Sequence, residues 1–196
     1  MPDKHFGRYS AIVMDNSEQS GQLTVQVPTI APETLIAKPA LPYGLFFVPE
    51  KNATVLVEFE GGDTRSALWS SVKCLEDQPW AEEADVPEKR VLKTAKGHLV
   101  IFQDADGEES IEIKDGVNGH VVTLDRDGIR LKDGVNQHTL TLASGGVTLE
   151  SHSDVTIKGE NITIEALTKL TMKAPEVNVE ASAKLTAKGN PIHLNP

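Results

Sequence analysis

Cysteine, aromatic residues and long apolar runs are scarce in this sequence, and each scarcity excludes a class of protein. A single cysteine, Cys74, allows no intrachain disulfide and suits a reducing compartment, with the thiol as a small buried group at a strand end. Aromatic residues make up 5% and hydrophobic residues 39% of the 196 residues, too little for a large globular core. The longest apolar runs, such as residues 45–48, are four residues long and too short to span a membrane, and the N-terminus shows no apolar signal segment. We therefore expect a thin architecture and synthesis in the cytoplasm without a signal peptide.

The charge balance is acidic, since 19 Lys and Arg stand against 29 Asp and Glu for a net charge of −10. Nucleic acid held through its phosphates needs a basic surface, so a nucleic-acid partner is not expected. Residues 1–75 hold six basic and eight acidic residues, and their aromatic residues do not cluster with the basic ones. A dispersed acidic surface of this kind commonly serves solubility.

Motifs of catalysis and metal binding are also missing. The six histidines are His5, His98, His120, His138, His152 and His193. None of them forms a His-x-His or His-x-x-x-His pair, so no metal site is predicted. Residues 104–109 have a misplaced glycine and glutamate for a calcium loop, and we interpret them as a hairpin turn. No Gly-x-Ser-x-Gly, phosphate loop or cysteine nucleophile occurs, so the sequence predicts no enzyme and no cofactor.

A repeat in the last fifty residues organises the rest of the chain. Pairs of the form apolar-x-apolar recur there, and their first members lie alternately eight and seven residues apart. Side chains of a strand alternate between its faces, so each pair places two side chains on one face of a short strand. Short strands separated by polar corners at this period are typical of a β-solenoid. The expected inward core consists of Val147, Leu149, Val155, Ile157, Ile162, Ile164, Leu170, Met172, Val177, Val179 and Leu185.

Two inward side chains per strand cannot enclose a core alone, and the solenoid can close in two ways. One chain could coil on itself with about three strands per turn, or three chains could wind about a common axis. The repeat is compatible with both closures. Small and β-branched inward residues suit a narrow prism, and no distinct N-terminal capping repeat is present, which favours three chains. We therefore expect a homotrimer.

Residues 1–75 show a different β-pattern. A proline-rich loop over residues 28–42 is not expected to hold a central strand, because proline cannot donate a ladder hydrogen bond. The expected strands are residues 9–15, 23–27, 55–60 and 66–70. Four or five short strands in this length predict a small barrel.

The middle of the chain begins with an acidic segment. Residues 76–90 contain two prolines and no apolar alternation, which predicts an extended linker before a third part, residues 91–196. Asp-Gly, a strong turn signal, recurs at residues 106–107, 115–116, 127–128 and 133–134. The strands expected around these turns are residues 99–102, 111–113, 121–124, 129–131 and 140–142. Gly-His followed by an apolar residue occurs at residues 97–99 and again at residues 119–121.

Three stretches carry a resemblance to a known family. They are Gly-Arg-Tyr at residues 7–9, Gly-x-Leu-x-Val-x-Val-Pro at residues 21–28, and the strand-and-turn stretch at residues 49–63 that ends in Gly-Gly-Asp. Together they resemble the oligonucleotide/oligosaccharide-binding (OB) domain of contractile-tail spike proteins, which include phage baseplate spikes, VgrG spikes and spikes of phage-derived injection particles. The family usually has glycine where Asn52 stands, and asparagine also tolerates a left-handed turn. The Gly-His and Asp-Gly units resemble the start of the spike needle.

The resemblance implies an all-β chain with an N-terminal OB barrel and a C-terminal intertwined trimeric β-helix. Its implied function is the membrane-piercing central spike of a phage baseplate or phage-derived injection particle, made in the bacterial cytoplasm and ejected towards the target envelope. Because VgrG proteins carry a hub region before the OB domain, a separate hub protein is the expected partner here. The alternative is a solenoid binding module whose OB barrel binds sugar or nucleic acid.

The C-terminal residues are expected to form a blunt three-fold end. Ile192 and Leu194 point inwards by alternation, so His193 points outwards and is not expected to bind a metal. Spikes that resemble this one and lack a built-in tip are sharpened by a cone-shaped PAAR-repeat protein. We therefore expect Ile192, His193, Leu194 and Asn195 of three chains to dock a PAAR-type protein.

Overall fold

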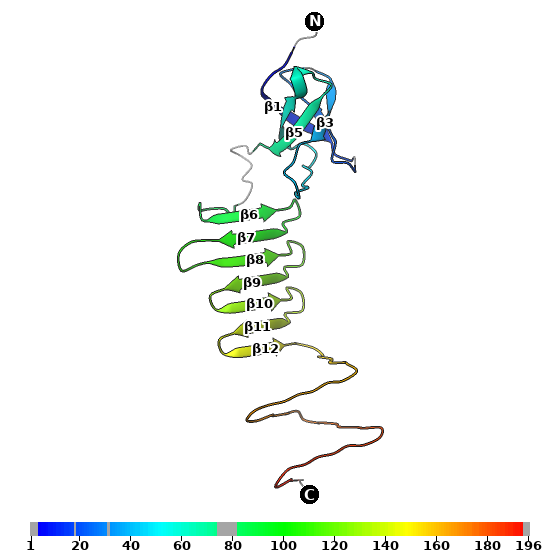
Figure 1. Ribbon diagram of the computed structural model, residues 1–196, viewed down its shortest axis with the longest axis vertical. Coiled ribbons are helices and arrows are strands. Elements are labelled where there is room, and N and C mark those ends of the chain that lie inside the picture. The colour runs from blue at the N-terminus through cyan, green and yellow to red at the C-terminus, as the bar shows by residue number, and fades with distance from the viewer. Residues whose placement is uncertain (1–3, 18, 31, 74–81, 194–196) are drawn as a thin grey trace. The chain divides into compact units, whose positions relative to one another are not determined.

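The computed structural model describes residues 4–17, 19–30, 32–73 and 82–193, and the regular structure within these residues consists of β-strands and one short 3-10 helix, Glu60–Gly62 (Figure 1). It divides into two units, Met1–Asp154 and Val155–Pro196. The first unit holds a closed barrel and a separate seven-stranded sheet. Cys74, predicted to be buried at a strand end, lies outside the described residues.

Five strands close the N-terminal barrel in the order β1-β2-β3-β5-β4. Their bounds are β1 Arg8–Asp15, β2 Leu23–Gln26, β3 Thr34–Pro39, β4 Thr54–Phe59 and β5 Ala67–Val72. All neighbours are antiparallel except β3 and β5, which run parallel. A turn before β4 places Asn52 at a φ of 71°, the left-handed conformation expected there. This barrel confirms the predicted OB-like N-terminal domain fold.

The alternation of apolar residues along these strands builds the core of the barrel. Every second residue points inwards, which buries Ala11, Val13, Leu23, Val25, Val27, Ala37, Val55, Val57, Phe59, Ala67 and Trp69. Burial of each Val, Leu or Phe side chain contributes about 1.5–3 kcal/mol. Trp69 Nε1 donates a hydrogen bond of 2.9 Å to the Gly21 carbonyl oxygen, so its polar atom is also satisfied.

Strand β3 corrects the prediction for residues 28–42. The proline-rich stretch holds a strand between β2 and β5, in which Leu35 pairs with Val25 and Ala37 pairs with Leu23. The prediction was wrong because the prolines flank this strand rather than interrupt it. Pro39 is the last residue of β3, and the next N–H, that of Ala40, donates to the Trp69 carbonyl oxygen at 2.8 Å.

The second sheet of this unit is an antiparallel meander in which every strand pairs with its neighbours in sequence. The strands are β6 Lys89–Lys93, β7 Leu99–Gln103, β8 Ser110–Lys114, β9 Val121–Asp125, β10 Gly128–Lys132, β11 Thr139–Ala143 and β12 Gly146–Glu150. Strands β7 to β11 confirm the five strands predicted around the Asp-Gly turns. The order is β12-β11-β10-β9-β8-β7-β6.

A β-helix was predicted for residues 91–196, and the structure instead shows a sheet up to Glu150 and an extended chain over residues 151–193. Short connections such as Arg126–Asp127, between β9 and β10, let each strand fold back on the one before it. A hairpin of this kind keeps the chain in one plane, whereas a β-helix must carry each strand to a new face. Up to Glu150, the pairing is therefore local and antiparallel.

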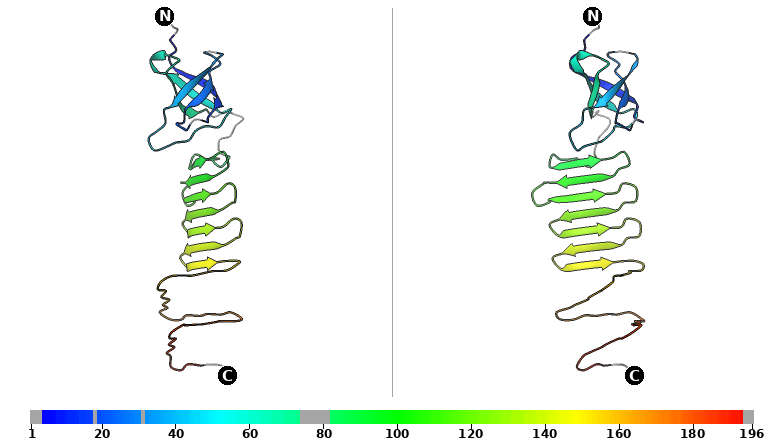
Figure 2. Two further views of the ribbon diagram at one scale, coloured as in Figure 1. Left: turned by 90° about the vertical axis from the view of Figure 1, so that its right-hand side faces the viewer. Right: turned by 45° about the vertical axis from the view of Figure 1, so that its right-hand side comes forward.

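The second unit, described from residue 155 to residue 193, is an extended chain that runs in long zigzag legs (Figure 2). No strand is present between residues 151 and 193, and no backbone–backbone hydrogen bond is recorded among them. Among the residues that the structure describes, no helix has the length and apolar character needed to cross a membrane.

Candidate assembly surface

Two parallel rows of apolar side chains cover one face of the β6–β12 sheet. Residues paired across antiparallel strands point to the same face, so the register assigns each side chain to a side. One row consists of Leu92, Val100, Ile113, Val122, Leu131, Leu140 and Leu149. The other consists of Arg90, Phe102, Ile111, Leu124, Ile129, Leu142 and Val147. Arg90, in the first strand, is the single polar member of the two rows, which we name the apolar face.

The opposite face of the same sheet is polar. Its central row consists of Val91, Ile101, Glu112, Thr123, Arg130, Thr141 and Thr148. Threonine and charged side chains replace the aliphatic ones from the third strand onwards. A sheet with one apolar and one polar side is built to bury the first and to expose the second to water.

The apolar face is largely open to solvent in the single chain. Val147 is 71% exposed, Leu149 59% and Ile113 48%. Leu99, on the other face, is the one buried residue among the described residues of β6–β12. Contiguous apolar surface of this extent marks an interaction site in a soluble protein.

The predicted inward core divides between the two units. Val147 and Leu149 lie in β12 on the apolar face, where they pair with Leu142 and Leu140. The other predicted members lie in the extended segment and are between 52% and 69% exposed. They are Val155, Ile157, Ile162, Ile164, Leu170, Met172, Val177, Val179 and Leu185. The single chain therefore does not bring these side chains together into a core.

Histidines connect successive turns along one edge of the sheet. Each follows a residue in the left-handed conformation: Gly97 with φ 79°, Gly119 with φ 72° and Gln137 with φ 63°. The Nδ1 atoms of His98, His120 and His138 accept the backbone N–H groups of Gly116 at 3.3 Å, Gly134 at 3.2 Å and His152 at 3.2 Å, respectively. Each histidine thus ties its own turn to the turn that follows.

Two aspartates stabilise these turns from inside. The backbone N–H groups of Val117 and Asn118 hold the pKa of Asp115 below its ordinary value. A hydrogen bond from the Asn136 side chain, followed by that from its backbone N–H, lowers the pKa of Asp133 to about 2. Carboxylates bound in this way fix the turn conformation.

The same carboxylates lie beside the histidines. Asp115 Oδ1 is 2.9 Å from His98 Nδ1, and Asp133 Oδ1 is 3.1 Å from His120 Nδ1. A protonated histidine donates to the carboxylate, whereas a neutral Nε2–H histidine accepts the glycine N–H, so the two contacts compete for one nitrogen. In the described part of the chain, no group of three or more ligating side chains that could hold a metal ion occurs. The arrangement is that of structural turns.

The predicted docking residues at the C-terminal end are only partly described. Ile192 is 51% exposed and His193 is exposed. Leu194 and Asn195 lie outside the described residues.

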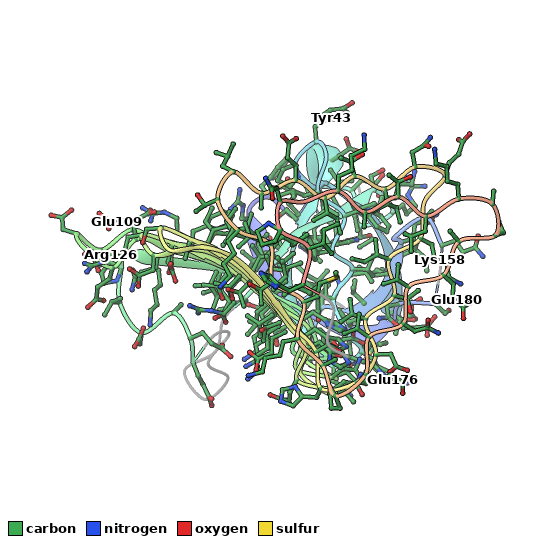
Figure 3. All side chains as sticks on the ribbon, turned by 90° about the horizontal axis from the view of Figure 1, so that it is seen from below. Tyr43, Glu109, Arg126, Lys158, Glu176 and Glu180 are labelled. Carbon is green, nitrogen blue, oxygen red and sulfur yellow. The ribbon has the colours of Figure 1, made fainter. Side chains whose placement is uncertain are left out.

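Two surfaces were missed by the sequence prediction. The apolar face begins well upstream of Val147, and the same apolar-x-apolar signal was present at residues 100–102, 111–113, 122–124, 129–131 and 140–142. The loop between β3 and β4 exposes Leu45, Phe46 and Phe47 as well as Tyr43, which projects into solvent (Figure 3). Its signal was the apolar run at residues 45–48.

Comparison with known protein families places the barrel. Residues 9–72 match the family model described as the Type VI secretion system/phage-baseplate injector OB domain. The matched residues are those of the barrel, and the β6–β12 sheet and the extended segment lie beyond them. No curated protein matches the chain. The barrel is therefore similar to a structural, non-enzymatic baseplate domain, which indicates a baseplate role and is consistent with assembly into a phage particle.

Proposed function

We propose that this chain is the subunit of a homotrimeric central spike in a contractile injection machine, such as a phage tail baseplate or a phage-derived particle. The observation that supports it best is the apolar face, which lies open in a chain whose barrel matches an injector domain. In the proposed trimer, the apolar faces of three β6–β12 sheets meet on the three-fold axis. Each chain then shields the two rows of the others from water.

In the same proposed trimer, the three extended segments that follow the sheets in sequence wind around one another as an intertwined β-helix. Two buried side chains per repeat contribute about 3–6 kcal/mol, whereas ordering seven or eight backbone residues costs about 7–15 kcal/mol. Burial alone does not hold the segment in place, and about seven ladder hydrogen bonds at 0.5–1.5 kcal/mol each are needed to balance the cost. Since the segment makes no backbone hydrogen bonds of its own between residues 151 and 193, the other two chains supply them in the trimer.

The length of the sequence repeat changes where we propose that the chain stops forming hairpins and begins to wind around the other two chains. Residues 114–131 and 132–149 align as two 18-residue repeats, each of which spans a long turn, two strands and a two-residue loop. Residues 151–165, 166–180 and 181–195 align as three 15-residue repeats without an Asp-Gly turn. Loss of the turn residues removes the hairpin, so the chain moves on to the next face of the prism.

A rod of this kind is a mechanical device, and no catalysis is part of the proposal. In the intertwined segment every ladder bond is made to another chain, so force along the axis meets a closed hydrogen-bonded network rather than free strand edges. The chain is made in the bacterial cytoplasm and assembled into the particle that is ejected towards the target envelope. A hub protein holds the barrel, and a PAAR-type protein docks on Ile192, His193, Leu194 and Asn195 of three chains.

Native mass spectrometry of the full chain tests the assembly. We expect a particle of three times 21.2 kDa. A monomer in solution would contradict the spike and would favour the binding-module alternative, which a sugar or oligonucleotide titration then examines.

A pull-down tests the tip. We expect the partner PAAR protein to be retained by the full chain and lost by a chain truncated after Lys188. Equal retention by both forms would rule out docking at residues 192–195.

A further inference from the structure

A charged residue follows each of the six apolar pairs between Val147 and Ala187, and its sign alternates. The six residues in order are Glu150, Lys158, Glu165, Lys173, Glu180 and Lys188. Each comes directly after the second apolar residue of its pair, in the same position of the repeat. No other position of the repeat alternates in sign over its whole length, so the pattern concerns this column in particular.

The geometry of a strand places these charges on the outside. A residue next to an inward side chain points to the opposite face, and Glu150 of β12 accordingly pairs with Thr139 on the polar face. All six side chains are exposed, and Lys158 and Glu180 extend away from the chain in Figure 3. None of the six takes part in an ion pair among the described residues of the single chain. Within the described residues, ion-pair partners for the six charges are therefore absent.

We propose that second and third copies of this chain supply these partners, and that the alternating column sets the register of the trimer. The inference rests on the proposed intertwined spike. Along one face of such a prism, consecutive strands come from different chains and lie about 4.8 Å apart. Strand 155–157 of one chain then stacks between strand 147–149 and strand 162–164 of the other two. Lys158 and Lys173 then each lie between two glutamates, and Lys188 lies beside Glu180.

The alternation discriminates between registers. In the symmetric trimer, neighbouring strands differ by one step of the repeat, so every neighbour carries the opposite charge. If one chain slips by a single step, its strands differ by two steps from the neighbour on one side and by none from the neighbour on the other. Like charges then meet on both sides, for example Lys158 with Lys173 and Glu165 with Glu180. Exposed ion pairs are individually weak, and like charges in direct contact are unfavourable, so the column acts by rejecting the slipped register.

A second column supports the same register. The residue directly before each pair also points outwards, and Lys169, Glu176 and Lys184 alternate in sign at successive strands. At both ends of these strands, opposite charges therefore lie side by side only when neighbouring strands are an odd number of repeat steps apart.

The test compares three variants of the full chain by thermal unfolding and native mass spectrometry. The first, K158E/K173E/K188E, makes the column uniformly acidic. The control, K38E/K51E/K96E, makes the same change in net charge at exposed lysines outside the repeat. The third variant adds E150K/E165K/E180K to the first and restores the alternation with inverted signs.

We expect the first variant to lose about 5–10 °C of Tm, more at low salt than at high salt, and the control to stay within about 2 °C of the wild type. The inverted variant recovers the wild-type Tm and the trimer. If the wild type is a trimer and the first variant melts with the control, or the inverted variant does not recover, the charge column has no role in register. A monomeric wild type would instead overturn the proposed spike itself.

Discussion

The stacked turns of the sheet pack so closely at some glycine residues that they leave no room for a side chain. A Cβ at Gly116 would lie 2.2 Å from the carbonyl carbon of Gly97 and 2.4 Å from the Lys96 carbonyl oxygen. Both are backbone atoms of the neighbouring turn, so the turns have to separate to admit a methyl group. The close approach that lets Gly116 N–H reach His98 is thus possible only for glycine at this position.

Gly116→Ala is accordingly expected to destabilise the protein by about 1–3 kcal/mol, the cost of overpacking a site that cannot relax. Gly145→Ala is the matched control, because nothing lies within 4 Å of a Cβ at Gly145 and its φ is not positive. Urea unfolding followed by circular dichroism measures both. Equal midpoints for the two variants would show that the turns do not stack as described.

The acid side of the stability profile depends on Asp133. Its pKa falls from the ordinary 3.8 to about 2 in the folded chain. A depressed carboxyl pKa gives stability that is fully present above the unfolded value and is lost as the pH falls towards the folded value. We expect Asp133→Asn to flatten the loss of stability between about pH 4 and pH 2, measured as urea midpoints across that range. A profile with the wild-type slope would exclude Asp133 as the titrating group.

At the scale of the elements, the alternation of apolar and polar residues predicts where strands lie but not which strands pair with each other. Strands β7 to β11 lie where period-two patterning and Asp-Gly turns placed them. Strand β3 was missed because the sequence shows four prolines without showing which residues of the ladder they occupy. The apolar pairs identified one face correctly, but two side chains per strand fit a hairpin sheet as well as a solenoid. Which strands pair depends on whether the chain folds back as a hairpin or winds on to a new face, and a local sequence pattern does not specify this.

The assignment of inward and outward side chains in the extended segment can be tested by placing an aspartate at one inward and one outward position. Val177→Asp places three carboxylates on the proposed axis, and we expect a loss of at least about 3 kcal/mol and dissociation of the trimer. Thr171→Asp puts the same side chain on the outward face, where a surface substitution costs under about 0.5 kcal/mol. Thermal unfolding and native mass compare the two. A similar Tm for both variants would show that the strand assignment is wrong.

At the scale of the whole molecule, the scarcity of aromatic residues is consistent with the small size of the buried core. The buried apolar residues of the described chain belong to the barrel, apart from Leu99, and the remaining apolar residues lie exposed in rows. Composition predicts a thin structure but not the exposed apolar face of its sheet. The candidate surface was predicted only from Val147 onwards, because upstream the pairs lie seven or eleven residues apart and not at the seven- or eight-residue step of the solenoid repeat.

Cleavage by a glutamate-specific protease distinguishes a single chain from an assembled spike. Residues 76–90 contain four glutamates in the acidic segment, and Glu165 and Glu180 lie in the extended segment. In the single chain, Glu165 and Glu180 are exposed in a stretch without backbone hydrogen bonds, which a protease can accommodate. In the proposed trimer, both glutamates lie within ladders formed with the other two chains, and local opening of such ladders is costly.

We therefore expect the first cuts within residues 76–90, leaving a trimeric fragment that begins near residue 90. Gel electrophoresis and native mass spectrometry measure the fragment and its assembly. Equally rapid cleavage at Glu165 and Glu180, with a monomeric barrel as the resistant product, would contradict the intertwined spike.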